Sequence, residues 1–104
     1  MKCSMDRFES VVRDAIDTIP GEFQPYLAGI EFVVARRSAE GMFGLYEGAG
    51  ALADEEALPA RITIFKESHE AAADTWEALV EEVRRTVLHE VGHHFHMGEA
   101  EMPY

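Results

Sequence analysis

The end of the chain contains two histidines at a spacing that can hold a metal ion. The run TVLHEVGHHFHMGEAEMPY carries four of the five histidines, and His89 and His93 stand four residues apart. On a helix, residues four apart lie on one face, so their imidazoles can converge on one zinc ion. Glu90 follows the first histidine, which completes the pattern H-E-x-x-H. This pattern predicts a zinc (Zn2+) site in which Glu90 acts on water and is not a ligand.

The chemistry that this arrangement predicts is the hydrolysis of a peptide bond. Zinc lowers the pKa of a bound water toward 7, which makes hydroxide available at neutral pH. Glu90 would take the proton as general base and deliver it to the leaving amine. We therefore predict a zinc-dependent metallopeptidase, although cobalt or manganese would also fit such ligands. The alternative is a zinc-binding domain that cleaves nothing and serves as a structural or partner-binding module. The small size of the chain favours it, whereas the presence of Glu90 argues against it.

A catalytic zinc site needs a third protein ligand and one open position. Three donors follow the histidine pair: His96, Glu99 and Glu101. His96 shares the face of His89, but on a straight helix their Cα atoms are about 10.5 Å apart along the axis, a strained distance for one zinc. Gly98 permits a sharp turn where the helix ends, and Glu99 could then swing back under the metal. We predict Glu99 as the third ligand, with His96 and Glu101 as the alternatives.

The histidine pair lies late in the longest periodic segment of the sequence, from Asp74 to about Met97. At 100° per residue, the apolar side chains of this segment fall within about 100° of arc. These residues are Trp76, Leu79, Val80, Val83 and Val87. His94 falls on the same stripe, whereas His89, His93 and His96 fall roughly 90–150° away. We expect one face to pack on a sheet and the other to hold the histidines, with Asp74 or Thr75 as the cap. An exposed histidine-rich helix end, or adventitious metal binding, is the simpler alternative.

Three segments before this helix alternate apolar and other residues in the way that is typical of strands. They are GIEFVVARR (29–37), GMFGLYEG (41–48) and ARITIFKES (60–68). Gly44 weakens the second strand, and the segment that follows it, AGALADEEALPA, predicts a loop or a short helix. An edge strand, residues 42–46 or 61–65, could align an extended peptide by adding it to the sheet.

The first predicted element is an amphipathic helix in SMDRFESVVRDAIDTIP, residues 4–20. Ser4 could cap this helix, and the Pro20-Gly21 pair stops it. With the segments above, the sequence predicts an α+β fold. Its parts are an N-terminal helix, a small mixed sheet of about three strands and a long C-terminal helix that carries H-E-x-x-H.

Length and composition favour one domain, residues 1–104, with a modest core. Hydrophobic residues make up 47% of the chain, and the net charge is −11. This charge argues against nucleic acid and anionic membranes as partners, because both require a basic surface. Cys3 is the one cysteine, so no disulfide can form within the chain, which fits a reducing compartment. No signal peptide or membrane-spanning run is visible, and we expect the cytoplasm.

The run RRTVLHEVGHHFHMGEAEM resembles the small bacterial zincin-like metallopeptidases, the "minimal" zincins of Asp-zincin type, whose pattern is H-E-x-x-H-x-x-G-x-x-D. GLYEG and LPARITIF also look like segments of that family, so the resemblance spans about residues 25–102. It implies a compact α/β domain, the minimal zincin-like fold, in which a small sheet packs on the active-site helix beside a single zinc. The resemblance implies His89 and His93 as ligands and Glu90 as the general base.

Two positions depart from the family pattern. His96 stands where the family has glycine, and Glu99 stands where it has aspartate. The glycine lets the chain leave the helix with φ > 0, a conformation that histidine adopts only occasionally. A later turn at Gly98, together with the longer glutamate side chain, would compensate. Otherwise the third ligand is altered and zinc is held weakly.

The remaining polar side chains have structural interpretations. His94 is expected in the core, with its ring N–H bonded to a backbone carbonyl. His69 lies in an acidic segment and is expected to be solvated. Tyr46 is expected to pack, although a phenol could also stabilise an oxyanion. The short tail would leave the cleft shallow and open on one side, which suits a peptide or protein substrate, or a protein partner that completes the cleft.

Overall fold

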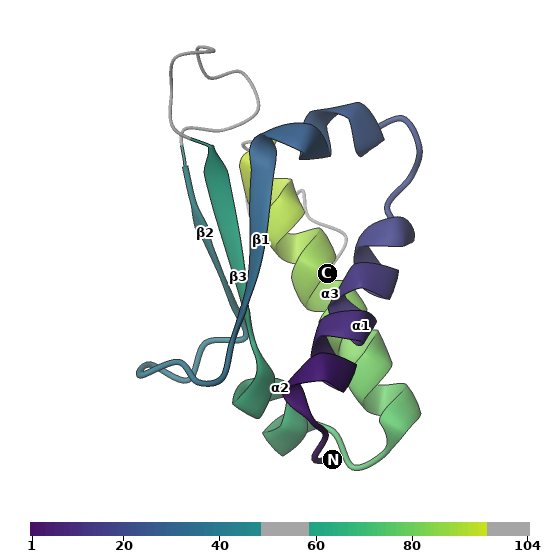
Figure 1. Cartoon of the computed structure of the whole chain (residues 1–104), viewed down its shortest axis with the longest axis vertical. Coiled ribbons are helices and arrows are strands. Elements are labelled where there is room, and N and C mark those ends of the chain that lie inside the picture. Colours follow the sequence, from purple (N-terminus) through teal and green to yellow (C-terminus); the bar gives the residue numbers. More distant parts are fainter. Residues whose placement is uncertain (49–58, 96–104) are drawn as a thin grey trace.

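The computed structural model describes residues 1–48 and 59–95, and Figure 1 shows how its elements are arranged. In chain order the elements are α1 (Met5–Asp17), the 3-10 helix η1 (Gln24–Gly29), β1 (Ile30–Ala35), β2 (Gly44–Glu47), β3 (Ala60–Phe65), α2 (Lys66–Ala72) and α3 (Trp76–His94). The predicted α+β fold is confirmed, with its two long helices and three strands. The helices η1 and α2 were not predicted. Nearly all of the predicted loop or short helix after β2 lies outside the described residues.

Both long helices begin at the caps that the sequence predicts. The Ser4 hydroxyl accepts a hydrogen bond from the N–H of Arg7 at 3.2 Å, and the Thr75 hydroxyl accepts one from the N–H of Ala78 at 3.1 Å. Each cap satisfies a backbone donor that the first turn of a helix leaves without an intrahelical acceptor. In the two stretches that the structure describes, no helix combines the length and the apolar character needed to cross a membrane.

The three strands form one mixed sheet in the order β1-β3-β2. β1 and β3 are parallel, whereas β2 is antiparallel to β3, with Gly44 opposite Ile64. The central strand β3 is therefore paired on both sides. The prediction of a peptide-aligning edge at residues 61–65 is therefore wrong, because β1 and β2 already pair with the two edges of this strand. β2 is an edge strand of the sheet, as the alternative prediction for residues 42–46 requires.

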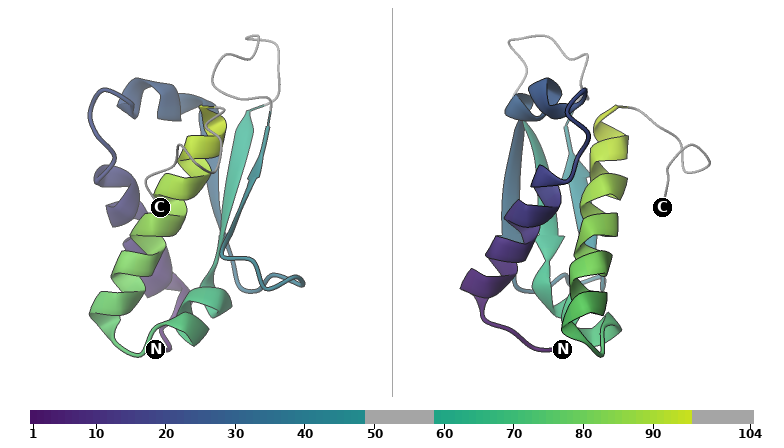
Figure 2. Two further views of the ribbon diagram at one scale, coloured as in Figure 1. Left: turned by 180° about the vertical axis from the view of Figure 1, so that it is seen from behind. Right: turned by 90° about the vertical axis from the view of Figure 1, so that its right-hand side faces the viewer.

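Helices α1 and α3 cover one face of the sheet, and the core lies between the helices and the strands (Figure 2). Ile62 and Ile64 are fully buried there, because alternate residues of β3 point toward the helices. The buried helical side chains recur at helical spacing: Phe8, Val11, Val12 and Ala15 on α1, and Leu79, Val83, Val87 and Val91 on α3. One member of the predicted stripe differs, since Val80 is 39% exposed and lines a surface groove between α1 and α3.

Candidate metal centre

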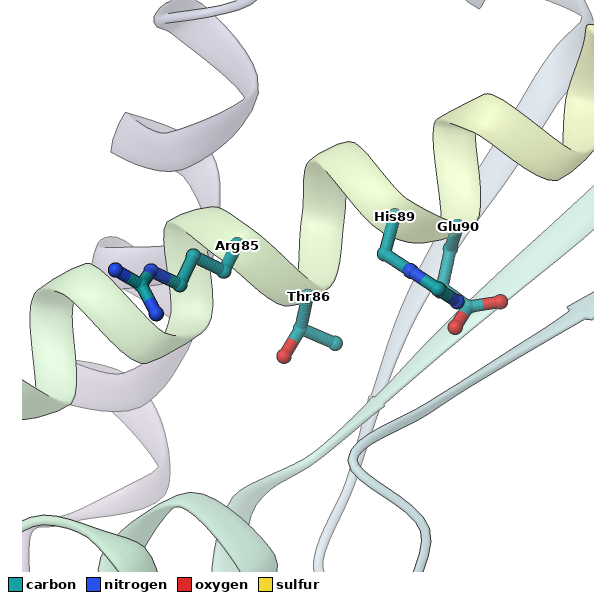
Figure 3. A pocket seen from close by; sticks show the side chains of 4 residues that line it. All are labelled: Arg85, Thr86, His89 and Glu90. Carbon is teal, nitrogen blue, oxygen red and sulfur yellow. The ribbon is translucent and has the colours of Figure 1, made fainter. Parts of the chain in front are cut away.

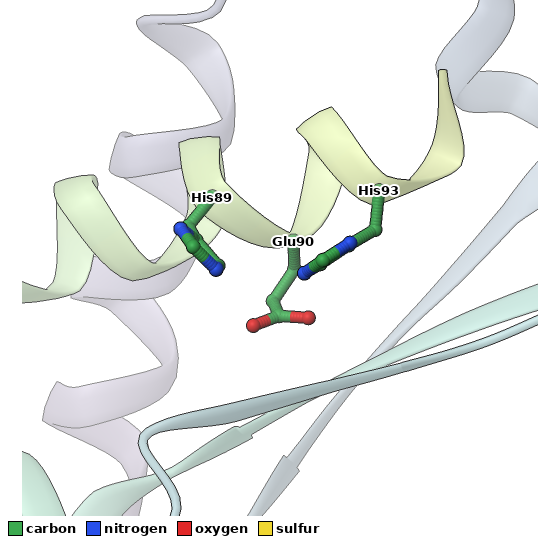
Figure 4. A group of neighbouring side chains, drawn as sticks. All are labelled: His89, Glu90 and His93. Carbon is green, nitrogen blue, oxygen red and sulfur yellow. The ribbon is translucent and has the colours of Figure 1, made fainter. Parts of the chain in front are cut away.

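Helix α3 carries His89, Glu90 and His93 on neighbouring positions, and their side chains project to one side of the helix (Figure 4). One potential ligand atom from each of the three residues lies within 4.8 Å of the others. The two imidazole rings meet edge to face, with centroids 5.0 Å apart. Both histidines are half-buried, whereas Glu90 is only 8% exposed. The spacing of four residues thus brings the two imidazoles together on one helical face, beside a buried carboxylate.

The other predicted parts of the metal site lie outside the described residues. Helix α3 ends at His94, before the predicted end near Met97, and the Phe95 N–H bonds to the Gly92 carbonyl at 3.1 Å. The candidates for the third ligand follow this end of the helix, and their roles remain predictions. These candidates are His96, Glu99 and Glu101.

The absence of a side chain at Gly44 lets β2 approach Glu90 closely. A Cβ at Gly44 would lie 2.8 Å from Thr86 Cγ2 and 2.9 Å from Glu90 Cγ, closer than non-bonded carbon atoms pack. It would also lie 3.3 Å from Glu90 Oε2. In the sequence this glycine only weakens the strand, yet a glycine inside a strand is also typical of a close approach by another segment. β2 therefore forms a wall against which the Glu90 side chain is held.

A second contact joins β2 to α3 two residues further along the strand. The Tyr46 hydroxyl and His94 Nδ1 are joined by a hydrogen bond of 2.8 Å, and the two rings meet edge to face. His94 is buried, as predicted, and the tyrosine hydroxyl is a partner that the sequence did not predict. Because Gly44 faces Glu90 and Tyr46 faces His94, β2 and α3 run in the same direction.

A buried histidine on α2 contacts α3 one turn before the histidine pair. His69 is fully buried, so the prediction that it is solvated is wrong. Its Nδ1 donates to the Phe65 carbonyl at 2.7 Å, and its Nε2 lies 2.8 Å from Thr86 Oγ1. Burial lowers the pKa of His69, which keeps the ring neutral. The prediction is wrong because residues 66–72 form helix α2, which directs His69 into the core. The acidic composition of this segment gave no indication of that helix.

A surface pocket of about 250 Å³ adjoins His89 and Glu90 (Figure 3). Its lining consists of Arg85, Thr86, His89 and Glu90. Arg85 Nε lies 3.4 Å from Glu81 Oε1, and Arg84 bonds the same carboxylate at 2.6 and 2.9 Å. Hydrogen bonding from Arg84 lowers the pKa of Glu81 to about 2. Arg85 was not predicted from the sequence as part of the site, although its place one turn before His89 puts it on the same face of the helix.

No curated protein matches the chain. A family model for zincin-like metallopeptidases matches residues 30–104. The matched part begins with β1 and includes all three strands and α3 with the histidine pair. Since the match covers more than half of the sequence, the chain belongs to the family of zincin-like metallopeptidases.

Proposed function

We propose that the protein is a zinc-dependent metallopeptidase that hydrolyses peptide bonds. The observation that carries this proposal is the group of His89, Glu90 and His93, whose ligand atoms lie within 4.8 Å of one another. Membership of the zincin-like metallopeptidase family supports it. Two imidazoles on adjacent turns of a helix suit a divalent cation such as zinc. His89 and His93 would hold this ion, together with a donor that follows α3, for which we favour Glu99.

Glu90 is the proposed general base. Zinc held by the two histidines would supply Lewis acidity to a substrate carbonyl and to water. Glu90, whose carboxylate lies beside both imidazoles, accepts the proton of the attacking water and passes it to the leaving amine. The buried position against Gly44 suits this role, because a side chain with few conformations open to it needs little reorganisation during the reaction.

The outer edge of β2 offers a way to align an extended substrate. The Phe65 N–H donates to the Phe43 carbonyl at 2.9 Å, so every second residue of β2, counted from Phe43, directs its backbone groups toward β3. The backbone groups of Gly44 and Tyr46 therefore point away from β3. A peptide that adds to this edge would form a further strand of the sheet beside the histidine pair. This alignment is part of the proposal.

The substitution Glu90→Gln tests the mechanism. Glutamine keeps the size of the side chain and removes the base, so we expect parental zinc content and a loss of hydrolysis of about 10²–10⁴-fold. Elemental analysis measures zinc per chain, and mass spectrometry of the products of a peptide library measures hydrolysis. Glu77→Gln, the same change at an exposed residue in the first turn of α3, is the control and should cleave at the parental rate.

The possible results separate the enzyme from its alternative. Equal hydrolysis by the parent and by Glu90→Gln would exclude Glu90 as the base. Zinc binding without any hydrolysis by the parent would support the second candidate, a zinc-binding domain that recognises a partner. Less than about 0.2 zinc per chain, with no uptake at micromolar zinc, would exclude the metal site of either candidate.

A further inference from the structure

The side chain of Thr86 connects a buried histidine to the proposed base. Its hydroxyl oxygen lies 2.8 Å from His69 Nε2 and 3.0 Å from the carbonyl oxygen of Glu82, one turn earlier in α3. Its methyl carbon and Glu90 Cγ lie 2.8 and 2.9 Å from the point where a Cβ of Gly44 would stand. These two carbon atoms are therefore neighbours, as expected for residues four apart, and Figure 3 shows both side chains on the same side of α3.

The surroundings of His69 decide which group donates each hydrogen bond. Nδ1 lies 2.7 Å from the Phe65 carbonyl oxygen, which can only accept, so Nδ1 carries a proton. Burial lowers the pKa of His69 and favours the neutral ring, in which Nε2 is an acceptor. The Thr86 hydroxyl therefore donates to Nε2.

The hydrogen bond to His69 selects one conformation of Thr86. Threonine in a helix divides between two χ1 rotamers, because its hydroxyl can bond a carbonyl of the preceding turn in either one. The Glu82 carbonyl alone therefore does not fix the side chain. Rotation by about 120° to the other well takes the hydroxyl away from Nε2 and the methyl group away from Glu90. As long as the bond to His69 is made, the methyl group stays beside Glu90.

We propose that His69 and Thr86 are positioning residues for the base, Glu90. His69 fixes the rotamer of Thr86, and the Thr86 methyl group and Gly44 of β2 together limit the conformations of the Glu90 side chain. This inference rests on the proposed function and adds two residues to the machinery of the same site. Neither residue is a proposed metal ligand, so their substitution should lower kcat and leave zinc affinity near the parental value.

Two substitutions of Thr86 separate this role from a purely structural one. Serine keeps the hydroxyl and removes the methyl group. A torsion of Glu90 released to three staggered wells leaves about a third of the molecules with the base in place, so kcat should fall about threefold or more. Valine keeps a methyl group beside Glu90 in its preferred helical rotamer, but it leaves buried Nε2 without a donor. Valine should therefore lower Tm at least as much as serine does and lower kcat much less.

A substitution of His69 tests the first link. In His69→Leu the acceptor is lost and Thr86 divides between two rotamers, so kcat should fall about twofold or more. The double variant His69→Leu/Thr86→Val should regain kcat, because valine has one strongly preferred rotamer in a helix without any partner. Thr63→Ser is the matched control, since Thr63 alternates with the buried residues of β3 and lies on the opposite face of the sheet. We expect parental kcat in this control. The assay measures kcat and KM on a cleaved peptide with the zinc-loaded, full-length protein.

Failure of this inference and failure of the proposed function give different results. Parental kcat in Thr86→Ser, a change in KM alone, or kcat losses that follow Tm in every variant would overturn the positioning role and leave the peptidase in place. If the parent cleaves no peptide, the proposed function fails, and NMR decides about His69. The three-bond couplings of the Thr86 methyl carbon report its rotamer. Single-rotamer values in the parent that become averaged in His69→Leu support the role of His69, and equal values in both proteins overturn it.

Discussion

Replacing Gly44 with alanine adds one methyl group at the point where β2 meets α3. The new Cβ would lie 2.8 Å from Thr86 Cγ2 and 2.9 Å from Glu90 Cγ. Non-bonded carbon atoms in contact are about 3.5–4.0 Å apart, so one side must move by more than about half an ångström. Thr86 is held by its stiff χ1 and by the hydrogen bond of its hydroxyl to His69 at 2.8 Å. Glu90 and β2 therefore take up most of the displacement.

The size of the effect should differ between stability and catalysis. Overpacking costs about 1–3 kcal/mol, and restriction of the unfolded chain by alanine offsets about 0.4–1 kcal/mol of this. The net loss of about 1–2 kcal/mol lowers the Tm of a domain of this size by roughly 4–16 °C. Hydrolysis should fall by on the order of 10²-fold, because a displacement near 1 Å of a reacting group has an effect of this size. Zinc affinity should stay near the parental value, because the new methyl group meets neither His89 nor His93.

Three measurements on the Gly44→Ala protein check this reasoning: Tm by circular dichroism, zinc affinity by competition with a chromophoric chelator, and kcat/KM on a cleaved peptide. Gly29→Ala is the matched control, since nothing lies within 4 Å of a Cβ at Gly29. Parental Tm together with parental hydrolysis in Gly44→Ala would refute the close approach of β2 to α3. Parallel losses of zinc affinity and hydrolysis would refute the separation between the metal ligands and the base.

Three further predictions concern the surroundings of the site. Tyr46→Phe removes the hydroxyl that lies 2.8 Å from His94 Nδ1, so thermal denaturation should show a loss of about 1–3 kcal/mol. Burial lowers the pKa of His69 below its usual value of 6.5, so below that pH the unfolded chain binds a proton that the folded protein does not. Stability should therefore be full above about pH 6.5 and fall as the pH drops further, and Tm should depend less on pH between about 7 and 5 in His69→Gln. Glu99→Ala should weaken zinc binding by on the order of several kcal/mol in a chelator competition, and His96→Ala far less. The reverse ranking would assign the third ligand to His96.

Features that depend on neighbours within one element were predictable from the sequence. Ser4 and Thr75 cap the long helices because a hydroxyl can reach the backbone N–H three residues later. His89 and His93 meet because helical geometry brings residues four apart onto one face. Each of these relations spans at most one turn of helix, so residue types and spacing are sufficient to predict it.

Features that depend on contacts between distant elements were not predictable in this way. The Tyr46–His94 hydrogen bond joins residues 48 positions apart, and no periodicity in the sequence relates them. The alternation in residues 60–68 predicted a strand but not its central place, because both edges of a strand have the same sequence pattern. The burial of His69 depends on Thr86, a partner from another helix, and the acidic neighbours of this histidine favoured the opposite prediction.

The histidine pair and the wall that β2 forms against Glu90 depend on contacts of different sequence separation. His89 and His93 lie on adjacent turns, so α3 presents both as soon as this one segment is helical. The wall that holds Glu90 is β2, which pairs with β3, and β3 pairs in turn with β1, where Ile30 and Ala60 are thirty residues apart. Contacts of such separation form slowly during folding, because a long loop must close first. Under the proposed function, a partly folded chain would therefore capture zinc before it could hydrolyse a peptide, and metal content alone would not report that a molecule has reached its native state.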